Sequence, residues 1–204
     1  MSFADMLGVR VGHYTEVVAR TGCTVLLLGE EGAVCGVRVG GGAPGTRETD
    51  GLEPGRAVER VHAICLSGGS AFGLSSADGV MRYLAERGIG FPVAGLRVPI
   101  VPSAIIFDLL EGTPTAPGPD GGYAACVIAE RAEGEPAEGQ VGAGTGATIG
   151  KLLGFDRRVP GGVGVASVPL PGGGVVGALV VVNAVGDVVD ETGRIVAGCG
   201  GWQA

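Results

Sequence analysis

The chain has 204 residues, of which 46% are hydrophobic and 17% charged, and its formal net charge is −7 at pH 7. This composition supports a buried core, while the acidic balance without a basic stripe argues against a nucleic-acid partner. No apolar run is long enough for a membrane span, and the first residues do not form a secretory signal. We therefore expect a cytoplasmic protein without membrane contact.

Glycine and cysteine narrow the class of protein further. Glycine occurs 42 times, about three times its ordinary share, which predicts many tight turns and close backbone approaches. The five cysteines show no CxxC spacing. An odd number of thiols, most of them in apolar stretches, favours reduced and buried side chains over disulfides or a metal site. We expect neither a metal nor a cofactor.

The first half of the chain places β-rich runs between glycine-rich turns. Residues 23–28 (CTVLLL) and 33–39 (AVCGVRV) are joined by GEEG and predict a hairpin. Residues 61–69 predict a buried strand that runs into a glycine turn. The apolar spacing of residues 70–88 predicts a helix with Ser70 as its N-cap.

The second half adds another helix and more strands. Residues 95–112 predict a proline-punctuated extended stretch, and the alanine-rich residues 120–132 predict a helix. Residues 163–170 and 175–190 predict strands joined by the turn PGGG, the second covered on both faces because it is nearly all apolar. Strands, central helices and further strands without regular alternation indicate an α+β fold with helices over a layered sheet, and a single domain over residues 1–204.

Lys151 ends the glycine-rich stretch VGAGTGATIGK (141–151), and it is the only lysine beside thirteen arginines. It has an ordinary interpretation as an exposed charge after a loop. Lysine differs from arginine, however, in that it can lose its proton when it is withdrawn from water. A site that needs a neutral amine or a compact proton donor would therefore retain a lysine here.

Asn183 interrupts the apolar run ALVVVNAV. A buried carboxamide without a partner costs a few kcal/mol, so this side chain must be hydrogen-bonded. The partner is either a loop carbonyl, which makes the residue structural, or a reacting group, since an amide on a rigid strand is a good oxyanion donor.

The two histidines give weaker evidence for a functional site. His62 adjoins Val61 in a strand and is interpreted as a satisfied core histidine, while His13 is expected in a turn with no acid nearby. Neither forms part of a nucleophile–histidine pair or a metal-binding cluster in the sequence.

Four stretches occur in an order that resembles one known family. They are HAICLSGGSAFGL, VPIVPSAIIFDL, VGAGTGATIGK and VVGALVVVNAVGDVVD. The resemblance runs from GVRVGHYTE to GRIVAG, over nearly the whole chain. It is to the self-processing aminopeptidase/D-esterase family, also called peptidase family S58 or DmpA-like, which includes β-aminopeptidases and nylon-oligomer hydrolases.

The resemblance implies an αββα four-layer sandwich, similar to N-terminal-nucleophile hydrolases but with different connectivity. Family members are made as precursors that cut themselves before a Ser or Thr, which becomes the nucleophile of an aminopeptidase or amidohydrolase that forms an acyl-enzyme. By this resemblance Lys151 lies near the nucleophile, and Asn183 donates a hydrogen bond to the oxyanion. It also implies a homo-oligomer of αβ units.

Two departures from the family pattern bear on this expectation. The cleavage step, an Asn or Gly followed by Ser or Thr downstream of GRIVAG, does not occur before Ala204. We therefore expect this chain to be the α-chain of a processed precursor or a truncated form, with a β-chain from the same precursor carrying the nucleophile. The second departure is Phe107, where some members have a tyrosine whose hydroxyl serves the oxyanion.

Two alternatives stay open from the sequence. One is acyl transfer in the manner of ornithine acetyltransferase, a self-cleaving enzyme of similar fold. The other is a non-catalytic binding or assembly module, if the chain stands alone. The sequence does not identify the amide that is cut.

Overall fold

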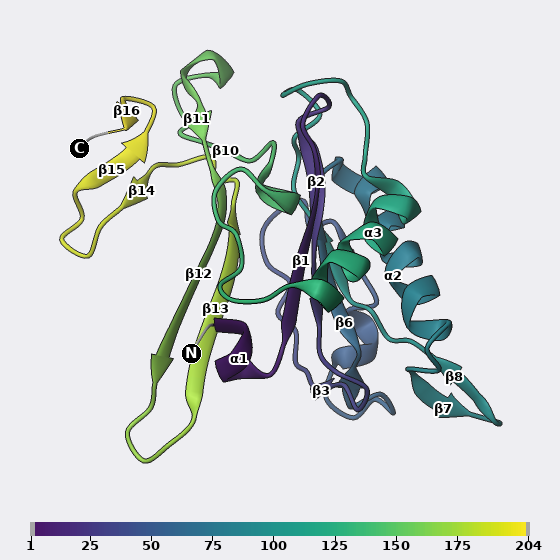
Figure 1. The fold of residues 1–204 in the computed structure, drawn as a ribbon. Coiled ribbons are helices and arrows are strands. Elements are labelled where there is room, and N and C mark those ends of the chain that lie inside the picture. The colour runs from purple at the N-terminus through teal and green to yellow at the C-terminus, as the bar shows by residue number, and fades with distance from the viewer. Residues whose placement is uncertain (1–2, 203–204) are drawn as a thin grey trace.

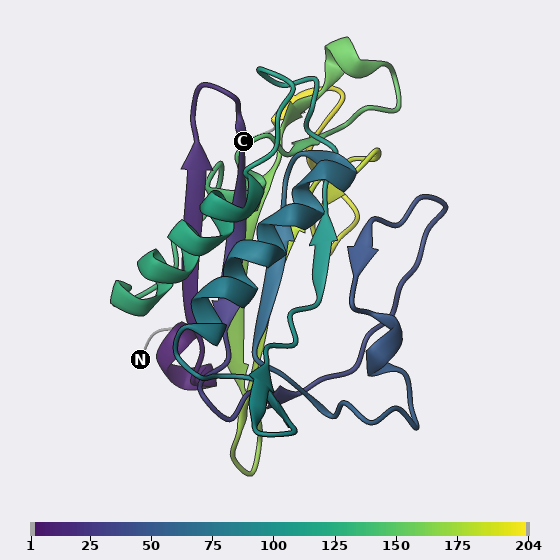
Figure 2. The ribbon, with the colours of Figure 1, turned by 90° about the vertical axis from the view of Figure 1, so that its right-hand side faces the viewer.

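Two helices lie side by side on one face of a five-stranded sheet, and a long β-hairpin lies beyond the other face (Figure 1). The computed structural model describes residues 3–202. Seen from the helix side, the layers follow one another as helices, sheet and hairpin (Figure 2). The α+β class expected from the sequence is confirmed. The described residues supply three layers of the expected four-layer sandwich.

The five-stranded sheet has its long strands in the centre and at one edge. Its order is β1 (Arg10–Glu16), β2 (Thr21–Leu27), β6 (Ala63–Ser67), β9 (Ser103–Ile105) and β4 (Thr46–Arg47). β6 and β9 run parallel, and every other neighbouring pair is antiparallel. The parallel pair brings the carboxyl ends of β6 and β9 to the same edge of the sheet.

Strand periodicity decides which side chains meet the helices. Cys23 and Val25 of β2 and Cys65 of β6 are fully buried in one cluster with the facing residues of α2 (Ser76–Ala85) and α3 (Gly118–Arg131). Because alternate strand residues point to opposite faces, this cluster defines the helix side of the sheet. The core contains small aliphatic residues and thiols, in keeping with the scarcity of aromatic residues.

Glycines allow the helices to approach closely. A Cβ added at Gly12 of β1 would lie 2.1 Å from the Ala125 carbonyl oxygen of α3, and one at Gly79 of α2 would lie 1.7 Å from the Pro119 oxygen. Neither position has room for a side chain. At Gly79 the close approach is between the two helices α2 and α3.

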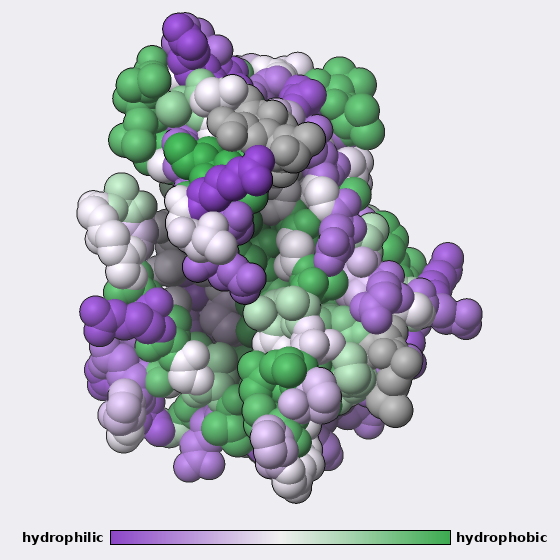
Figure 3. All heavy atoms as spheres, turned by 90° about the vertical axis from the view of Figure 1, so that its left-hand side faces the viewer, coloured by the Kyte–Doolittle hydropathy of each residue, from purple (hydrophilic) through white to green (hydrophobic). Residues whose placement is uncertain are grey.

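The opposite face of the sheet meets the turn η3 (Gly142–Gly144), which separates it from the hairpin of β12 (Gly162–Pro169) and β13 (Val175–Val182). The short helix α1 (Phe3–Leu7) packs on the inner face of this hairpin, where Gly177 contacts Leu7 and Phe3. The outer face carries only glycine, alanine and valine, and three of its four valines are about half exposed: Val168, Val176 and Val180. Figure 3 views the molecule from this side.

The remaining elements are short. β10 (Thr148–Ile149) pairs with β11 (Val159–Pro160), and β14 (Val188–Val189), β15 (Ile195–Gly198) and β16 (Gly201–Trp202) form a small sheet. β3 (Ala33–Val34) pairs with β5 (Arg60–Val61), and β7 (Phe91–Val93) with β8 (Leu96–Val98). Three further 3-10 helices are η1 (Asp50–Leu52), η2 (Ser70–Ser75) and η4 (Phe155–Arg157). No helix within residues 3–202 has both the length and the apolar character to cross a bilayer.

The predicted hairpin of residues 23–39 is wrong. β2 pairs with β1 on one side and β6 on the other, so its edges are already occupied. Only Ala33 and Val34 of the second run form a strand, and they pair with β5 instead.

The helix of residues 70–88 begins later than predicted. Ser70 has a φ of +53°, in the left-handed region, and starts the 3-10 helix η2 rather than capping an α-helix. The strand predicted for residues 175–190 ends at Val182, and its burial alternates instead of being complete, because its outer face is open.

We expect Gly79→Ala to destabilise the protein. Alanine favours a helix over glycine by about 1 kcal/mol, but the added methyl would overlap the Pro119 carbonyl oxygen, and overpacking costs about 1–3 kcal/mol or more. The free energy of unfolding in urea should fall by that amount. Gly164→Ala is the matched control, because a Cβ there meets no atom within 4 Å. Equal stability of the two variants would contradict this close contact.

Candidate functional site

Lys151 is positioned by the glycine that precedes it. Gly150 has a φ of +71°, and a Cβ there would lie 2.4 Å from the backbone nitrogen of Cys199, so only glycine fits. Gly150 N donates to the Gly186 carbonyl at 2.9 Å, and Lys151 N donates to the Val185 carbonyl at 2.7 Å. The segment after β10 is therefore fixed against the segment after β13.

Asn183 follows directly after β13, where these two segments meet. Its carboxamide oxygen Oδ1 accepts the Thr148 backbone N–H at 2.9 Å, and its nitrogen Nδ2 donates to the Phe107 carbonyl at 3.2 Å. An N–H donor on one end and a carbonyl acceptor on the other determine the orientation of the amide. The side chain thereby links three segments that are far apart in the sequence.

The Lys151 amine contacts the same carboxamide. Nζ lies 2.8 Å from Asn183 Oδ1, 2.7 Å from the Thr148 carbonyl oxygen and 3.4 Å from the Asn183 carbonyl oxygen. Three acceptors around one nitrogen match the three hydrogens of an ammonium group. The two residues are also the only lysine and the only asparagine of the chain.

An ion pair lies close enough to influence this amine. Burial lowers the pKa of Lys151, the Glu111 carboxylate opposes that shift, and the Arg158 guanidinium adds to it. Arg158 Nε donates to Glu111 Oε1 at 2.7 Å, and the Glu111 side chain is nearly buried. The carboxylate that stabilises the ammonium form of Lys151 is therefore shared with the Arg158 guanidinium.

Asp108 adjoins the site and was not among the residues predicted from the sequence. Asp108 is 2% exposed, and its carboxylate accepts hydrogen bonds from Thr21 Oγ1 at 2.8 Å and from the Gly69 N–H at 2.6 Å. Burial raises its pKa, and both hydrogen bonds act in the opposite direction. An acid inside the apolar stretch AIIFDL was the available signal, because charged residues are rarely buried without partners.

The structure brings the two predicted site residues together but changes their setting. Asn183 is half-buried at the end of a strand, not inside one, because the chain turns away at that point to meet Lys151. Phe107 takes part through its carbonyl oxygen, and the residue is 45% exposed.

The histidines lie elsewhere. His62 is buried, and its Nδ1 accepts the Ile100 N–H at 3.1 Å, as expected of a satisfied core histidine. His13 was expected in a turn but belongs to β1, where its Nδ1 pairs with Thr24 Oγ1 at 2.9 Å beneath the η3 turn. Burial lowers the pKa of both imidazoles.

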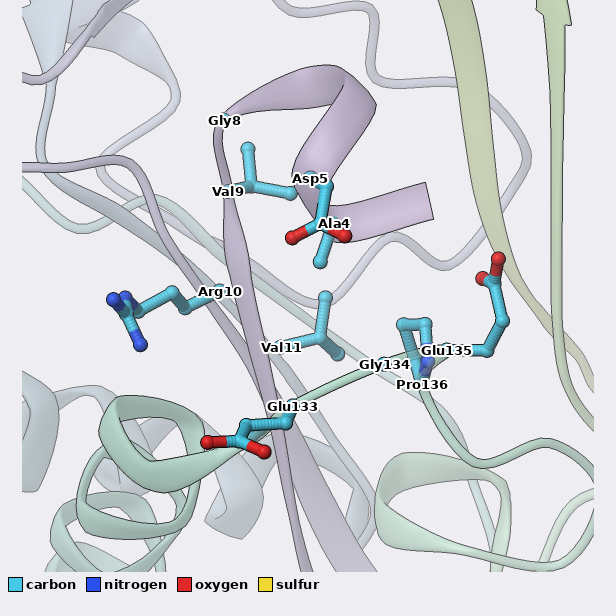
Figure 4. Close-up of a pocket in the computed structure, with 11 residues that line it drawn as sticks. Ala4, Asp5, Gly8, Val9, Arg10, Val11, Glu133, Gly134, Glu135 and Pro136 are labelled. Carbon is cyan, nitrogen blue, oxygen red and sulfur yellow. The ribbon is translucent and has the colours of Figure 1, made fainter. Parts of the chain in front are cut away.

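A cavity of about 620 Å³ opens between α1, the start of β1 and residues 132–136 (Figure 4). Its charged side chains are Asp5, Arg10, Glu133 and Glu135, and Glu135 accepts the Phe3 N–H. None of its lining residues belongs to the Lys151–Asn183 site. Among residues 3–202, no three His, Cys, Asp or Glu side chains gather in a manner suited to a metal ion.

The site can therefore offer a positive charge and one amide N–H donor at one point. A carboxamide nitrogen carries two hydrogens, and the bond to Phe107 uses one of them. Such a combination stabilises negative charge that develops on an oxygen.

Comparison with known proteins shows which family the chain belongs to. The model of peptidase family S58 matches residues 2–198. An uncharacterized aminopeptidase of Mycobacterium leprae is 47% identical over 206 residues, which cover 93% of this chain and 54% of that protein. A 6-aminohexanoate-oligomer endohydrolase of Kocuria sp. is 36% identical over 196 residues, covering 95% and 51%. The chain thus spans about half the length of these relatives.

Solved structures agree with this assignment. A β-aminopeptidase of Burkholderia sp. superimposes with a TM-score of 0.69 at 26% identity, over 89% of this chain and 52% of that one. An L-aminopeptidase D-Ala-esterase/amidase of Ochrobactrum anthropi, described as a variant of the Ntn-hydrolase fold, gives 0.65 at 20% identity, over 89% and 53%. The second likeness shows a shared fold. Taken with the family match over residues 2–198, these results show that the chain belongs to peptidase family S58.

Proposed function

We propose that this chain forms the larger part of a self-processed amide hydrolase, an aminopeptidase or small-amide hydrolase that works through an acyl-enzyme. The observation that carries the proposal is the 2.8 Å contact between Lys151 Nζ and Asn183 Oδ1. It joins a cation and a carboxamide at one place, next to the Phe107 carbonyl. The nucleophile, a Ser or Thr at a new N-terminus, comes from a β-chain of the same precursor.

In this mechanism the Asn183 carboxamide stabilises the oxyanion. When a Ser or Thr hydroxyl attacks the amide carbonyl, the carbonyl oxygen gains negative charge in the tetrahedral intermediate. Asn183 Nδ2 donates its second N–H to that oxygen. Lys151 and Thr148, which both donate to Oδ1, polarise the amide and hold its N–H in position.

Lys151 lowers the pKa of the α-amine that acts as the base. The α-amine of the nucleophile must be neutral to take the hydroxyl proton, and a positive charge nearby lowers its pKa because a second cation is disfavoured. The same ammonium favours the developing oxyanion. Both effects need the charge at Lys151 rather than the transfer of its proton.

Two observations support a second polypeptide. The relatives are about twice as long as this chain, and the outer face of the β12–β13 hairpin exposes Val168, Val176 and Val180. An apolar sheet face of this kind normally packs against another layer. The β-chain would supply that layer together with the nucleophile.

Asn183→Ala in the full-length protein should lower kcat on an aminoacyl p-nitroanilide. Removal of one oxyanion donor typically costs about 10²–10³ in rate. Thermal unfolding of the variant should be measured as a control, because the side chain also links Thr148 to Phe107. A decrease smaller than about threefold would exclude Asn183 as the donor.

Lys151→Met should raise the pKa that governs the acidic limb of the kcat/KM profile. Loss of a positive charge near the α-amine makes its protonation easier, so activity should require a pH about one to two units higher. Lys151→Arg is the control, because it keeps the charge and should keep the limb near its original position. An unchanged limb in the methionine variant would contradict this role.

Purified full-length protein should contain two polypeptides when its intact mass is measured. We expect the smaller one to begin with Ser or Thr, since cleavage creates the nucleophile. A single, uncut species with full amidase activity would contradict the self-processing part of the proposal.

A further inference from the structure

A buried acid lies directly beside the site and has no part in the mechanism above. Asp108 follows Phe107 in the chain and is 2% exposed. Within residues 3–202 its carboxylate is held by neutral donors and forms no ion pair, which is a costly arrangement for an acid. A cost of this kind calls for an explanation in structure or in function.

The carboxylate uses both of its oxygens inside the protein. Oδ2 accepts the Thr21 hydroxyl of β2 at 2.8 Å, and Oδ1 accepts the Gly69 N–H of the turn after β6 at 2.6 Å. Because the side chain is nearly inaccessible and its oxygens are occupied, it cannot contact a substrate. Any effect of Asp108 on the reaction must pass through another residue.

Two glycine turns close around this side chain. A Cβ added at Gly68 would lie 2.0 Å from Asp108 Oδ2, and one added at Gly146 would lie 2.7 Å from Asp108 Cβ. Gly146 belongs to the stretch that continues to Thr148, whose N–H and carbonyl group bind Asn183 and Lys151. Asp108 is thus wedged between the turn after β6 and the loop that carries the site.

The peptide of Phe107 is anchored on both sides. Before it, Ile106 N donates to the Ser67 carbonyl at 2.9 Å, and the Ile106 carbonyl accepts the Ser70 N–H at 3.0 Å. After it, the Asp108 carboxylate provides the second anchor. Phe107 is itself about half exposed, so the position of its carbonyl depends on these neighbours.

We propose that Asp108 is a positioning residue, whose carboxylate holds the Phe107 carbonyl where it orients the Asn183 carboxamide. The Phe107 oxygen is the acceptor that the structure gives to Asn183 Nδ2, so its displacement would release that end of the amide. The catalytic consequence rests on the proposed function, whereas the orientation of the amide does not.

Activity in a double-mutant cycle tests the coupling. In the full-length protein, Asp108→Ala should lower kcat by about 10²-fold and leave KM within about threefold. If Asp108 acts through Asn183, the double variant with Asn183→Ala should be no slower than Asn183→Ala alone. Effects that multiply would overturn the proposal. Asp108→Asn, which keeps an acceptor for Gly69, should retain kcat within about fivefold.

A control is needed to distinguish a specific loss of kcat from a general loss of stability. Val80→Ala truncates a fully buried residue of α2 away from the site and should destabilise the protein without changing kcat. If Asp108→Ala does not fold, Thr21→Val removes one of the two hydrogen bonds to the carboxylate and should lower kcat in the same direction by a smaller factor. A Thr21→Val enzyme that folds and keeps its full kcat would also overturn the proposal.

The side-chain amide of Asn183 gives a readout that does not depend on activity. In full-length protein labelled with [15N]asparagine, its signal is the one missing from Asn183→Ala. Hydrogen exchange of this amide should be at least about tenfold faster in Asp108→Ala and unchanged in Val80→Ala. Unchanged exchange in Asp108→Ala would overturn the positioning role. Inactive wild-type protein with the expected exchange would instead overturn the proposed function alone.

Discussion

The arrangement of the site depends on the contact between the Lys151 ammonium and the Asn183 carboxamide. The amide oxygen receives two donors, and its nitrogen meets a carbonyl, so the group has one stable orientation. Three strands or loops that are distant in sequence must therefore end at the same place. The parallel pair β6–β9 contributes by bringing Phe107 and the turn after β6 to one edge of the sheet.

The geometry also explains why lysine, and not arginine, occupies position 151. Its three acceptors are two backbone carbonyl oxygens and one amide oxygen, grouped around a single nitrogen. A compact ammonium directs three hydrogens from one atom, whereas a guanidinium spreads its donors over a plane. The sequence alone indicates only that lysine, unlike arginine, can lose a proton. The structure adds a geometric reason that holds for the charged form.

Much of the fold could be predicted from the sequence, and so could the two candidate residues that the structure brings into contact, for reasons that are local. Lys151 and Asn183 stood out because each is chemically unlike its neighbours, and the helix at residues 118–131 follows from composition. The incorrect or missing predictions concern residues whose role depends on contacts with distant parts of the chain. His13 was expected in a turn but lies in β1, where the neighbouring Gly12 is required by the approach of α3. Asp108 was overlooked because its partners, Thr21 and Gly69, are distant in the sequence.

The outer face of the β12–β13 hairpin has a consequence for whatever covers it. No side chain on that face exceeds the size of valine, so the surface is shallow and has few projections of its own. Protein interiors reach crystal-like density only when large groups on one side fill the space left by small ones on the other. Since aromatic residues make up just 4% of this chain, a layer packed on this face would have to contribute the large side chains itself.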